Sequence, residues 1–337
     1  MSQDELFELS DWSTWASQAA PLFKWAGGKQ RFLWHHRDLL PLSLDGRTYH
    51  EPFAGGLSVF FHLCAHAPRP FEAKLADTNL QLIKTYQAVA RDWRQIGVDL
   101  RAMERALQES PDPAEYFYRV RAEHNAIRPR VDAARFIFLM RVGWNGVYRT
   151  NRSGAFNVPF GGKVQVRMPS DAELRATATA LGTATIRATS WESSLTAAKE
   201  GDFVFLDPPY FGGDNEKANL YDLRRPFLLS DQEALAAELG SLQRRGVEFV
   251  LTNSAHPTLI SLYRDYGLSV TVTEALRSVS GKVDGRGVIG EIIVRPSAAT
   301  RSKVRASASL RLRGLSVINS QRSTNSTTEG ERNGNGS

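Results

Sequence analysis

The feature of this sequence that most constrains its fold is a short apolar run that ends in two prolines. Residues 202–206 carry the β-prone side chains of a buried strand. Asp207, Pro208, Pro209 and Tyr210 follow at once, and neither proline can donate a hydrogen bond to a neighbouring strand. An acid, two backbone carbonyls and an aromatic ring therefore stand at the carboxyl end of a strand, where open α/β sheets bind ligands.

This tetrapeptide suits a planar base that carries an exocyclic amine. The Asp207 carboxylate and a prolyl carbonyl can accept two hydrogen bonds from the amine, while the Tyr210 ring stacks on the base. On its own the tetrapeptide is equally compatible with a turn after a core strand, so its meaning depends on the other motifs.

Composition predicts a soluble, reduced, cytoplasmic protein. The chain has 337 residues, enough for one large domain or two ordinary ones. It contains no apolar run long enough to span a membrane and no secretory leader. Cys64 is the only cysteine, which argues against a disulfide framework and a thiolate metal site, and we expect no metal cofactor. The apolar stretch around Cys64 predicts a buried small hydrophobe.

Most of the net charge of +6 lies in the C-terminal tail. Residues 297–337 contain seven Lys or Arg residues and two Glu residues, which leaves a charge of +1 for the first 296 residues. This tail is rich in Ser, Thr, Asn, Gly and Arg, so we expect it to be disordered and dispensable for function. Residues 1–20 form an N-terminal leader without a diagnostic motif.

A glycine turn between an aromatic residue and a lysine is the first dense motif along the chain. Residues 22–29 read Leu-Phe-Lys-Trp-Ala-Gly-Gly-Lys. A phosphate-binding loop would need glycine in place of Phe23 and Ser or Thr in place of Gln30, so we exclude that interpretation. Trp25 and Lys29 instead predict a turn that holds a flat, partly charged ligand.

A second glycine turn follows a predicted strand. Residues 49–59 begin as a strand, pass through Glu51 and Phe53, and turn at Gly55 into a helix. Asp77 ends the next predicted strand, about 20 residues beyond the glycine turn, which is the Rossmann-like arrangement for binding ribose hydroxyls.

The middle of the chain is predicted to be helical and then to form a loop or hairpin. Apolar residues at three- and four-residue spacing predict helices over residues 81–90, 93–107, 113–126 and 131–142. Residues 143–163 are rich in Gly, Arg and Asn with interleaved aromatic residues. Such a segment suits the reading of base edges and phosphates.

After this segment the α/β pattern returns. Ser170 with Glu173, and Ser230 with Glu233, predict capping boxes that open two helices. Further strands are predicted at 183–188, 247–251, 268–273 and 290–294, the last two forming an antiparallel pair at the sheet edge. A helical and loop segment therefore interrupts an α/β domain.

Four motifs in this order resemble those of the Dam-type (D12 class) DNA adenine-N6 methyltransferases. They are Lys-Trp-Ala-Gly-Gly-Lys at 24–29, Glu-Pro-Phe at 51–53, the recognition region, and Asp-Pro-Pro-Tyr at 207–210. The similarity covers about residues 22–294. One departure is visible, because the family's Phe-x-Gly-x-Gly turn reads Phe-Ala-Gly-Gly-Leu at 53–57.

The resemblance implies a fold and a domain organisation. The fold would be α/β, a Rossmann-like S-adenosylmethionine-dependent methyltransferase fold with an inserted, mainly helical target-recognition domain. The catalytic domain would comprise residues 21–85 and 184–296, and the recognition domain residues 86–183. The leader (1–20) and the tail (297–337) would lie outside both.

The resemblance also implies the ligands and the residues that bind them. S-adenosylmethionine would be the methyl donor, bound by Trp25, Lys29, Glu51, Phe53, Gly55, Asp77 and Asp207. Double-stranded DNA would be the substrate of a monomeric enzyme, with the target adenine flipped out of the stack. Asp207 and the Pro208 carbonyl would accept from the adenine amine, and Tyr210 would stack on the base.

The recognition segment matches the family's hairpin that reads GATC. Trp144 matches the aromatic residue that wedges beside the flipped base in that family. Asn145 matches the asparagine that contacts what the flipped base leaves behind, and Arg149 matches the arginine that reads a guanine. Asn151 is also retained. Gly162 stands where some GATC readers carry a basic residue. The expected target is therefore GATC or a relative that shares its central adenine context.

Three alternatives remain open at this point. A cytosine-N4 methyltransferase would attack the same kind of amine, although its signature usually opens with Ser rather than Asp207. A methyltransferase acting on RNA or on glutamine amides would not need residues 144–162. The third is a DNA-binding module without turnover, against which the intact Lys29, Asp77 and Tyr210 argue.

Overall fold

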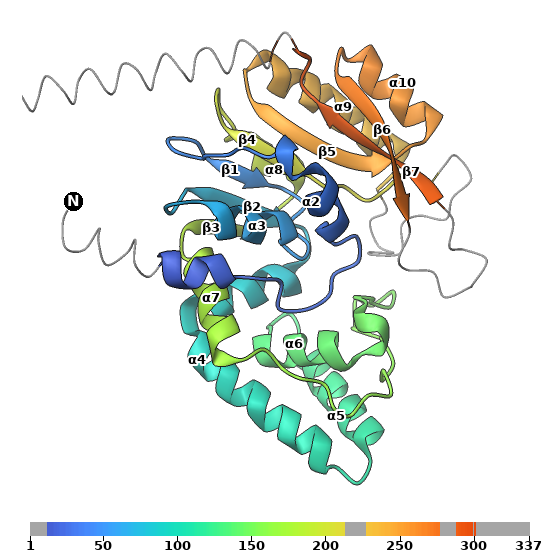
Figure 1. The fold of residues 1–337 in the computed structure, drawn as a ribbon. Coiled ribbons are helices and arrows are strands. Elements are labelled where there is room, and N and C mark those ends of the chain that lie inside the picture. The colour runs from blue at the N-terminus through green and yellow to red at the C-terminus, as the bar shows by residue number, and fades with distance from the viewer. Residues whose placement is uncertain (1–11, 213–226, 277–287, 299, 301–337) are drawn as a thin grey trace, which may run out of the picture.

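A seven-stranded, mostly parallel sheet organises the chain (Figure 1). The computed structural model describes residues 12–212, 227–276, 288–298 and 300. Along the sheet the order is β3 (Ala184–Ala188), β2 (Ala73–Asp77), β1 (Tyr49–Glu51), β4 (Phe203–Leu206), β5 (Glu248–Ser254), β7 (Val288–Arg295) and β6 (Ser269–Leu276). Strands β1 to β5 are parallel, whereas β7 runs antiparallel to both β5 and β6. The strand order reverses between β1 and β4, so their carboxyl ends form the topological switch point.

The predicted strands are confirmed, including the antiparallel pair at the sheet edge. All four residues of β4 are buried, as expected of a central strand covered on both faces. Strand β5 continues three residues beyond its predicted end, through Thr252–Ser254. This extension carries polar side chains to the edge of the sheet where Asp207 lies.

The chain between β2 and β3 is helical, as predicted. It forms α4 (Leu80–Glu109), α5 (Pro113–Ala126), α6 (Ala133–Val142), η3 (Trp144–Gly146) and α7 (Asp171–Leu181). The two helices predicted at 81–90 and 93–107 share the label α4, and the non-helical backbone of Asp92 separates them, as predicted. The capping box at Ser170 and Glu173 is confirmed.

The capping box predicted at Ser230 is wrong. Helix α9 (Leu229–Arg244) begins one residue before Ser230, which therefore lies inside the first turn. The Asp231 carboxylate accepts a hydrogen bond of 2.7 Å from the Leu228 N–H. Asp231 thus stands at the third helical position, where a side-chain acceptor can satisfy a backbone donor that the helix itself leaves unpaired.

Two buried clusters cover the two sides of the sheet. One combines α8 (Trp191–Leu195), α9 and α10 (Pro257–Asp265) with side chains of β4 and β5. The other is larger and combines α2 (Gln30–His36), α3 (Ser58–His66) and α7 with the helices α4 to α6.

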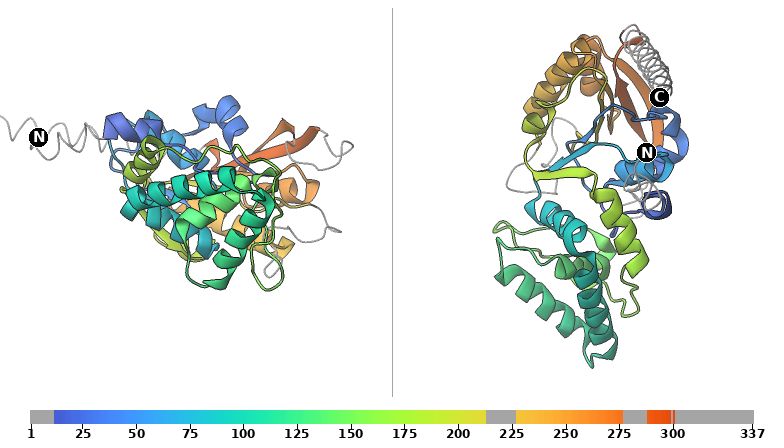
Figure 2. Two further views of the ribbon diagram at one scale, coloured as in Figure 1. Left: turned by 90° about the horizontal axis from the view of Figure 1, so that it is seen from below. Right: turned by 90° about the vertical axis from the view of Figure 1, so that its left-hand side faces the viewer.

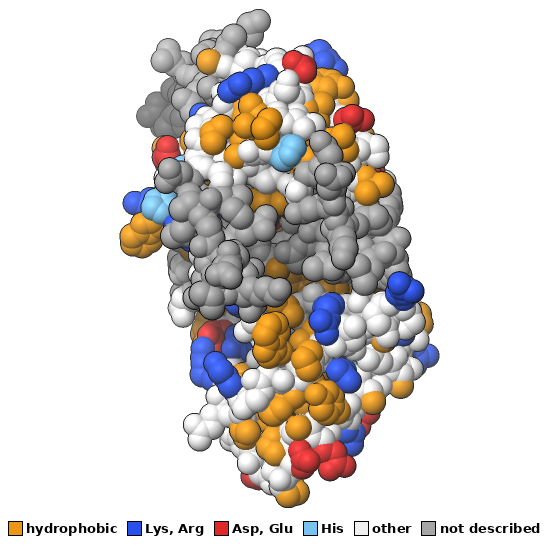
Figure 3. All heavy atoms as spheres, turned by 90° about the vertical axis from the view of Figure 1, so that its right-hand side faces the viewer, with side chains coloured by type: hydrophobic (Ala, Val, Ile, Leu, Met, Phe, Trp, Pro, Cys, Tyr) orange, Lys and Arg blue, Asp and Glu red, His pale blue; other side chains and the backbone are white. Residues whose placement is uncertain are grey.

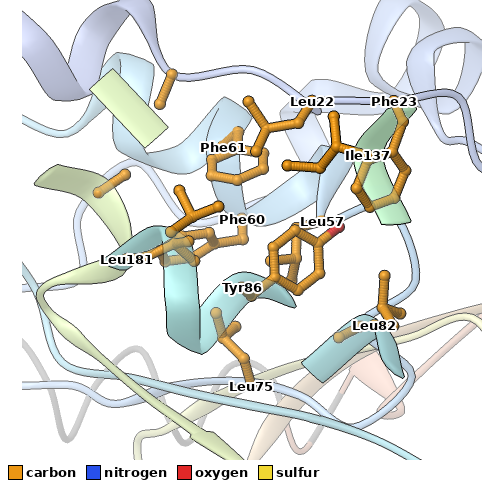
Figure 4. Close-up of a cluster of buried hydrophobic side chains, with 14 of the residues drawn as sticks. Leu22, Phe23, Leu57, Phe60, Phe61, Leu75, Leu82, Tyr86, Ile137 and Leu181 are labelled. Atoms are coloured by element: carbon orange, nitrogen blue, oxygen red, sulfur yellow. The ribbon is translucent and has the colours of Figure 1, made fainter. Parts of the chain in front are cut away.

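The larger cluster joins the helical segment to the sheet. In Figure 4, Phe23 from the N-terminal segment and Leu57 from the glycine turn lie beside Tyr86 of α4 and Ile137 of α6. The teal and green helices α4 to α6 then extend away from the sheet (Figure 2). The proposed boundary between residues 85 and 86 falls within α4, whose helix packs on both β2 and β3.

The start of the described chain packs on this core. Trp12 is buried, and its indole Nε1 donates to the Ala67 carbonyl at 3.2 Å. The η1 turn (Ala16–Gln18) follows, and η2 (Arg37–Leu39) continues α2. Cys64 is buried, as predicted. The basic tail beyond Thr300 lies outside the described residues.

Candidate active site

Asp207 lies at the carboxyl end of β4 and is held by residues from two distant parts of the chain. Lys29, only 7% exposed, places its Nζ 2.5 Å from Asp207 Oδ2 and also donates to the Gly27 carbonyl at 2.6 Å. The Thr252 hydroxyl, at the end of β5, donates to Asp207 Oδ1 at 2.9 Å. Both carboxylate oxygens of Asp207 are therefore held by side chains of the protein itself.

Tyr210 is anchored through its hydroxyl group. The hydroxyl donates to the Glu291 carboxylate on β7, and the Lys29 Nζ lies 5.3 Å from the centre of the Tyr210 ring. No described residue donates to the Pro208 carbonyl. Two of the predicted catalytic residues, Asp207 and Tyr210, thus lie against one lysine, and Pro208 lies between them in the chain.

The glycine turn after β1 is shaped by Trp25. A Cβ on Gly55 or Gly56 would lie 2.9 Å from atoms of Trp25, so only glycine lets the indole pack this closely. The Trp25 ring stacks on Tyr148, with centroids 5.4 Å apart. The N-terminal motif, the β1 turn and the segment after α6 therefore meet at one indole.

Asp77 closes the same turn from the end of β2. Its carboxylate accepts from the Gly55 N–H at 3.0 Å and from the Asn79 N–H at 2.8 Å. The Tyr86 hydroxyl donates to the Gly55 carbonyl at 2.8 Å. Phe53 points elsewhere, into an edge-to-face contact with Phe227 at 6.0 Å.

Leu57 occupies the position of the second glycine in the family's turn, and its backbone is left-handed. Leu57 adopts the left-handed conformation, with φ 55° and ψ 28°, directly before α3. A side chain in this region costs on the order of 1 kcal/mol. Leu57 is 1% exposed within the large core, and burial of its side chain offsets that strain by roughly 1.5–3 kcal/mol.

Three carboxyl groups lie around the glycine turn and the end of β4, with Glu51 buried and Asp77 and Asp207 half-buried. Burial raises the pKa of Glu51 to about 8; the nearby Asp207 adds to this, while Lys29 and a 2.7 Å hydrogen bond from Tyr49 oppose it. Burial also raises the pKa of Asp77 and, against Lys29, the pKa of Asp207. Three neighbouring carboxyl groups whose pKa values are raised suit a ligand that carries positive charge.

Residues 143–160 form two antiparallel limbs, joined by bridges between Gly143 and Phe160 and between Thr150 and Phe156. Asn145 adopts a positive φ of 55° and lies beside Gly146, at φ 62°, in a tight turn. Trp144 is 48% exposed at this turn. Both side chains that were predicted to enter DNA therefore stand on the surface.

The other two predicted DNA-binding residues are engaged within the segment. Arg149 donates from Nε to Asn157 Oδ1 at 2.9 Å and from Nη2 to the Asn157 carbonyl at 3.1 Å. The Asn151 Oδ1 accepts from Ser153 and from the Ala155 N–H, which fixes the turn between the limbs. Figure 3 shows basic and hydrophobic side chains mixed over this helical part of the molecule.

Sequence reasoning assigned no role to several residues that complete the site. Thr252, Tyr86, Glu291 and Gln232 reach it from β5, α4, β7 and α9. Only Thr252 was marked in the sequence, by the polar triplet Thr252–Ser254 at the end of β5. Tyr86, Glu291 and Gln232 lie within ordinary helices or strands and have no such signal. Within the described part of the chain, no three His, Cys, Asp or Glu side chains gather as a metal site, and no helix could cross a membrane.

The fold and the site together define an α/β protein of the methyltransferase type, with its acid–aromatic turn at the sheet's switch point. The chain belongs to the D12 class N6 adenine-specific DNA methyltransferase family, which it matches over residues 25–279.

Relatives with related names cover most of the chain. It is 31% identical over 283 residues to the Type II methyltransferase M1.LlaDCHI of Lactococcus lactis subsp. cremoris, covering 81% of this chain and 94% of that protein. It is 30% identical over 273 residues to the DNA adenine methylase of Escherichia coli K12, covering 80% and 92%. A DNA N-6-adenine-methyltransferase of Escherichia phage P1 is 32% identical over 277 residues, covering 81% of this chain but 35% of that longer protein.

Proposed function

We propose that this protein transfers a methyl group from S-adenosylmethionine to the N6 amine of adenine at a specific site in double-stranded DNA. The observation that carries the proposal is the convergence of Lys29 and Thr252 on Asp207 at the switch point. The family match includes all three of these residues. It also favours adenine over the cytosine-N4 and RNA alternatives.

The residues around the β1 turn fit S-adenosylmethionine. The carboxyl groups of Glu51, Asp77 and Asp207 suit its sulfonium and ammonium charges, which an anionic dinucleotide would not satisfy. Asp77 would hold the ribose hydroxyls and Trp25 would pack on the cofactor, while Glu51 and Gly55 would face its methionine end. The bound cofactor would supply an activated methyl group.

The chain's own contribution is to orient the amine and to hold its proton. Asp207 and the Pro208 carbonyl would each accept one N6–H, which aims the nitrogen lone pair away from both acceptors. Transfer of the methyl group to N6 would break its bond to the sulfonium sulfur, leaving a neutral thioether, and the Asp207 carboxylate would receive the proton that N6 then loses. Tyr210, fixed by Glu291, would stack on the flipped base. Catalysis would rest on positioning and electrostatics.

We further propose GATC, or a site with the same central adenine context, as the target. Trp144 and Asn145 lie exposed at the tip of the turn after α6, as a wedge and its neighbour require. Arg149 uses Nε and one Nη2 hydrogen to hold Asn157, which leaves the outer edge formed by Nη1 and Nη2 for a guanine.

Labelled methyl transfer followed by nucleoside analysis tests the reaction. The protein is incubated with methyl-tritiated S-adenosylmethionine and either duplex DNA or RNA, and the labelled nucleoside is identified. We expect N6-methyladenine from duplex DNA. Label in N4-methylcytosine or in RNA would support one of the alternatives, and no transfer with tight DNA binding would favour a binding module.

Protection from a nuclease that GATC adenine methylation blocks tests the site. Plasmid from cells that express the protein should resist that nuclease. Plasmid that is cleaved, yet carries N6-methyladenine elsewhere, would refute the GATC assignment and leave the chemistry intact.

A further inference from the structure

Gln232 lies on α9, on the far side of the catalytic turn from Lys29, and is fully buried. Its side-chain Nε2 donates to the Pro209 carbonyl at 3.1 Å. Its Oε1 accepts from Asn253 Nδ2 at 3.1 Å and from the Tyr263 hydroxyl at 3.2 Å. An amide that is buried and paired at both ends is held in one orientation, because rotating it would break every bond at once.

Asn253, whose amide is bonded to Gln232, also binds the backbone of Phe211 in the same turn. Its Oδ1 accepts from the Phe211 N–H at 3.0 Å and from the Ser254 N–H at 2.8 Å. The Ser254 hydroxyl in turn donates to the Phe211 carbonyl. Two linked amides therefore bracket Tyr210, one holding the carbonyl before it and the other the N–H after it.

These bonds determine which prolyl carbonyl remains for a substrate. The rings of Pro208 and Pro209 fix both φ angles, so the ψ angles are the soft torsions between Asp207 and Tyr210. The bond from Gln232 to the Pro209 carbonyl fixes the second ψ angle and aims that carbonyl at α9. The Pro208 carbonyl receives no bond from any described residue and is the carbonyl left for an amine.

We propose that Gln232 is a positioning residue, which holds the Pro209 carbonyl toward α9 so that Asp207 and the Pro208 carbonyl face the amine. This inference rests on the proposed methyl transfer. Gln232 itself touches no reacting atom. Its effect should therefore appear in the rate of the chemical step rather than in the binding of cofactor.

A matched pair of variants separates positioning from stability. Gln232→Met removes the bond to the Pro209 carbonyl together with both bonds at Oε1, whereas Tyr263→Phe removes only one of the two donors to Gln232 Oε1. We expect Gln232→Met to lower kcat by roughly 10- to 100-fold, as misplaced reacting groups do. Its Kd for S-adenosylmethionine should stay within about twofold of wild type, and Tyr263→Phe should keep kcat within about threefold. Equal kcat losses in the two variants, or a wild-type kcat in Gln232→Met, would overturn the inference.

Gln232→Glu provides a second variant of nearly identical shape. Its carboxyl group can donate to the Pro209 carbonyl when protonated but not when ionised. We expect its kcat to fall with rising pH more steeply than that of the wild-type protein. Parallel pH profiles would contradict the role of the donated bond.

Hydrogen exchange measures the same positioning without activity. Exchange is followed at the Phe211 N–H, within the segment 205–212 in which Pro208 and Pro209 have no N–H. Its exchange should become at least about tenfold faster in Gln232→Met and remain unchanged in Tyr263→Phe. If the wild-type protein methylates no DNA, the proposed function fails, whereas unchanged exchange in Gln232→Met would overturn the role of Gln232 itself.

Discussion

Asn125 and Phe156 are joined by two hydrogen bonds between one side chain and one backbone. The Asn125 amide, on α5, donates to the Phe156 carbonyl at 3.0 Å and accepts from the Phe156 N–H at 2.9 Å. Arg121, on the same helix, donates to the Val158 carbonyl, and Arg128, just beyond the end of that helix, donates to the Ser153 carbonyl. Helix α5 therefore holds the returning limb of the 143–160 segment by its backbone, independently of the side chains that the limb displays.

Asn125→Ala should loosen this segment and weaken site-specific DNA binding. Two net hydrogen bonds contribute about 1–3 kcal/mol, and their loss leaves a backbone N–H and carbonyl unpaired. We expect the preference for the target over unrelated duplex DNA to fall about tenfold or more in a competition assay. Glu115→Ala, on an exposed position of the same helix, is the control. An unchanged preference in Asn125→Ala would show that α5 does not fix the conformation of residues 143–160.

Asp207→Ala should abolish methyl transfer without unfolding the protein. The variant loses the acceptor for the amine, which we expect to lower kcat by at least about 100-fold. It also leaves the buried Lys29 without its ion-pair partner, so the melting temperature should fall. Transfer is measured with labelled cofactor, and folding by circular dichroism. Asp265→Ala, at an exposed position, should behave as wild type, and near-normal transfer by Asp207→Ala would refute its assignment.

Trp25→Ala and Asp77→Ala should each weaken S-adenosylmethionine binding by about 1–3 kcal/mol. Trp25→Ala removes the aromatic surface over the glycine turn, and Asp77→Ala removes an acceptor that also orders the Gly55 N–H. Calorimetry measures the affinity. Trp34→Ala is a matched control, because that indole is 81% exposed. The cofactor site lies elsewhere if affinity is unchanged in both site variants.

The contribution of Glu51 to the stability of the protein should be lost as pH rises from about 4.5 to about 8. The folded-state pKa of Glu51 is about 8, above its ordinary value of 4.5, so the folded protein binds this proton more tightly than the unfolded chain. That contribution is fully present below pH 4.5 and is lost as pH approaches 8, at a cost on the order of a few kcal/mol.

Glu51→Gln isolates this effect, because glutamine has the same shape and does not titrate. We expect urea unfolding at pH 5, 6.5 and 8 to show that the variant loses less stability than the wild-type protein as pH rises. His124, whose pKa burial lowers to about 4, makes stability rise with pH up to about 6.5 in both proteins, so the effect of Glu51 is read from the difference between the two profiles. Identical slopes in the variant and the wild-type protein would mean that Glu51 is ionised in the folded state.

Arg149→Ala should weaken the selectivity for the first base of the recognition site. This loss should be larger than the fall in methylation rate on DNA that carries another base at that position. A bidentate contact to guanine contributes about 1–3 kcal/mol of discrimination. Modified-base sequencing of DNA treated with the variant measures that loss of selectivity. Arg152→Ala changes a neighbouring exposed arginine and serves as the control. Unaltered specificity in Arg149→Ala would assign the guanine contact to another side chain.

The sequence by itself determined the local elements of this protein. The strand before Asp207, the glycine turn after β1 and the capping box at Ser170 all follow from neighbouring residues, and the structure contains each of them. Hydrophobic periodicity reports which face of an element is buried, and turn residues report backbone conformation, so both are readable within about ten residues. The order of the four motifs also determined the family.

Only the tertiary structure decided how these elements meet. Lys29 and Thr252 are far from Asp207 in sequence, yet they supply its ion pair and its hydrogen bond. The raised pKa of Glu51 arises from burial among groups of several elements, and the left-handed backbone of Leu57 is offset by burial in a core built from distant helices. Desolvation and hydrogen-bond partners depend on distance in space rather than along the chain, and local sequence patterns carry no record of that distance.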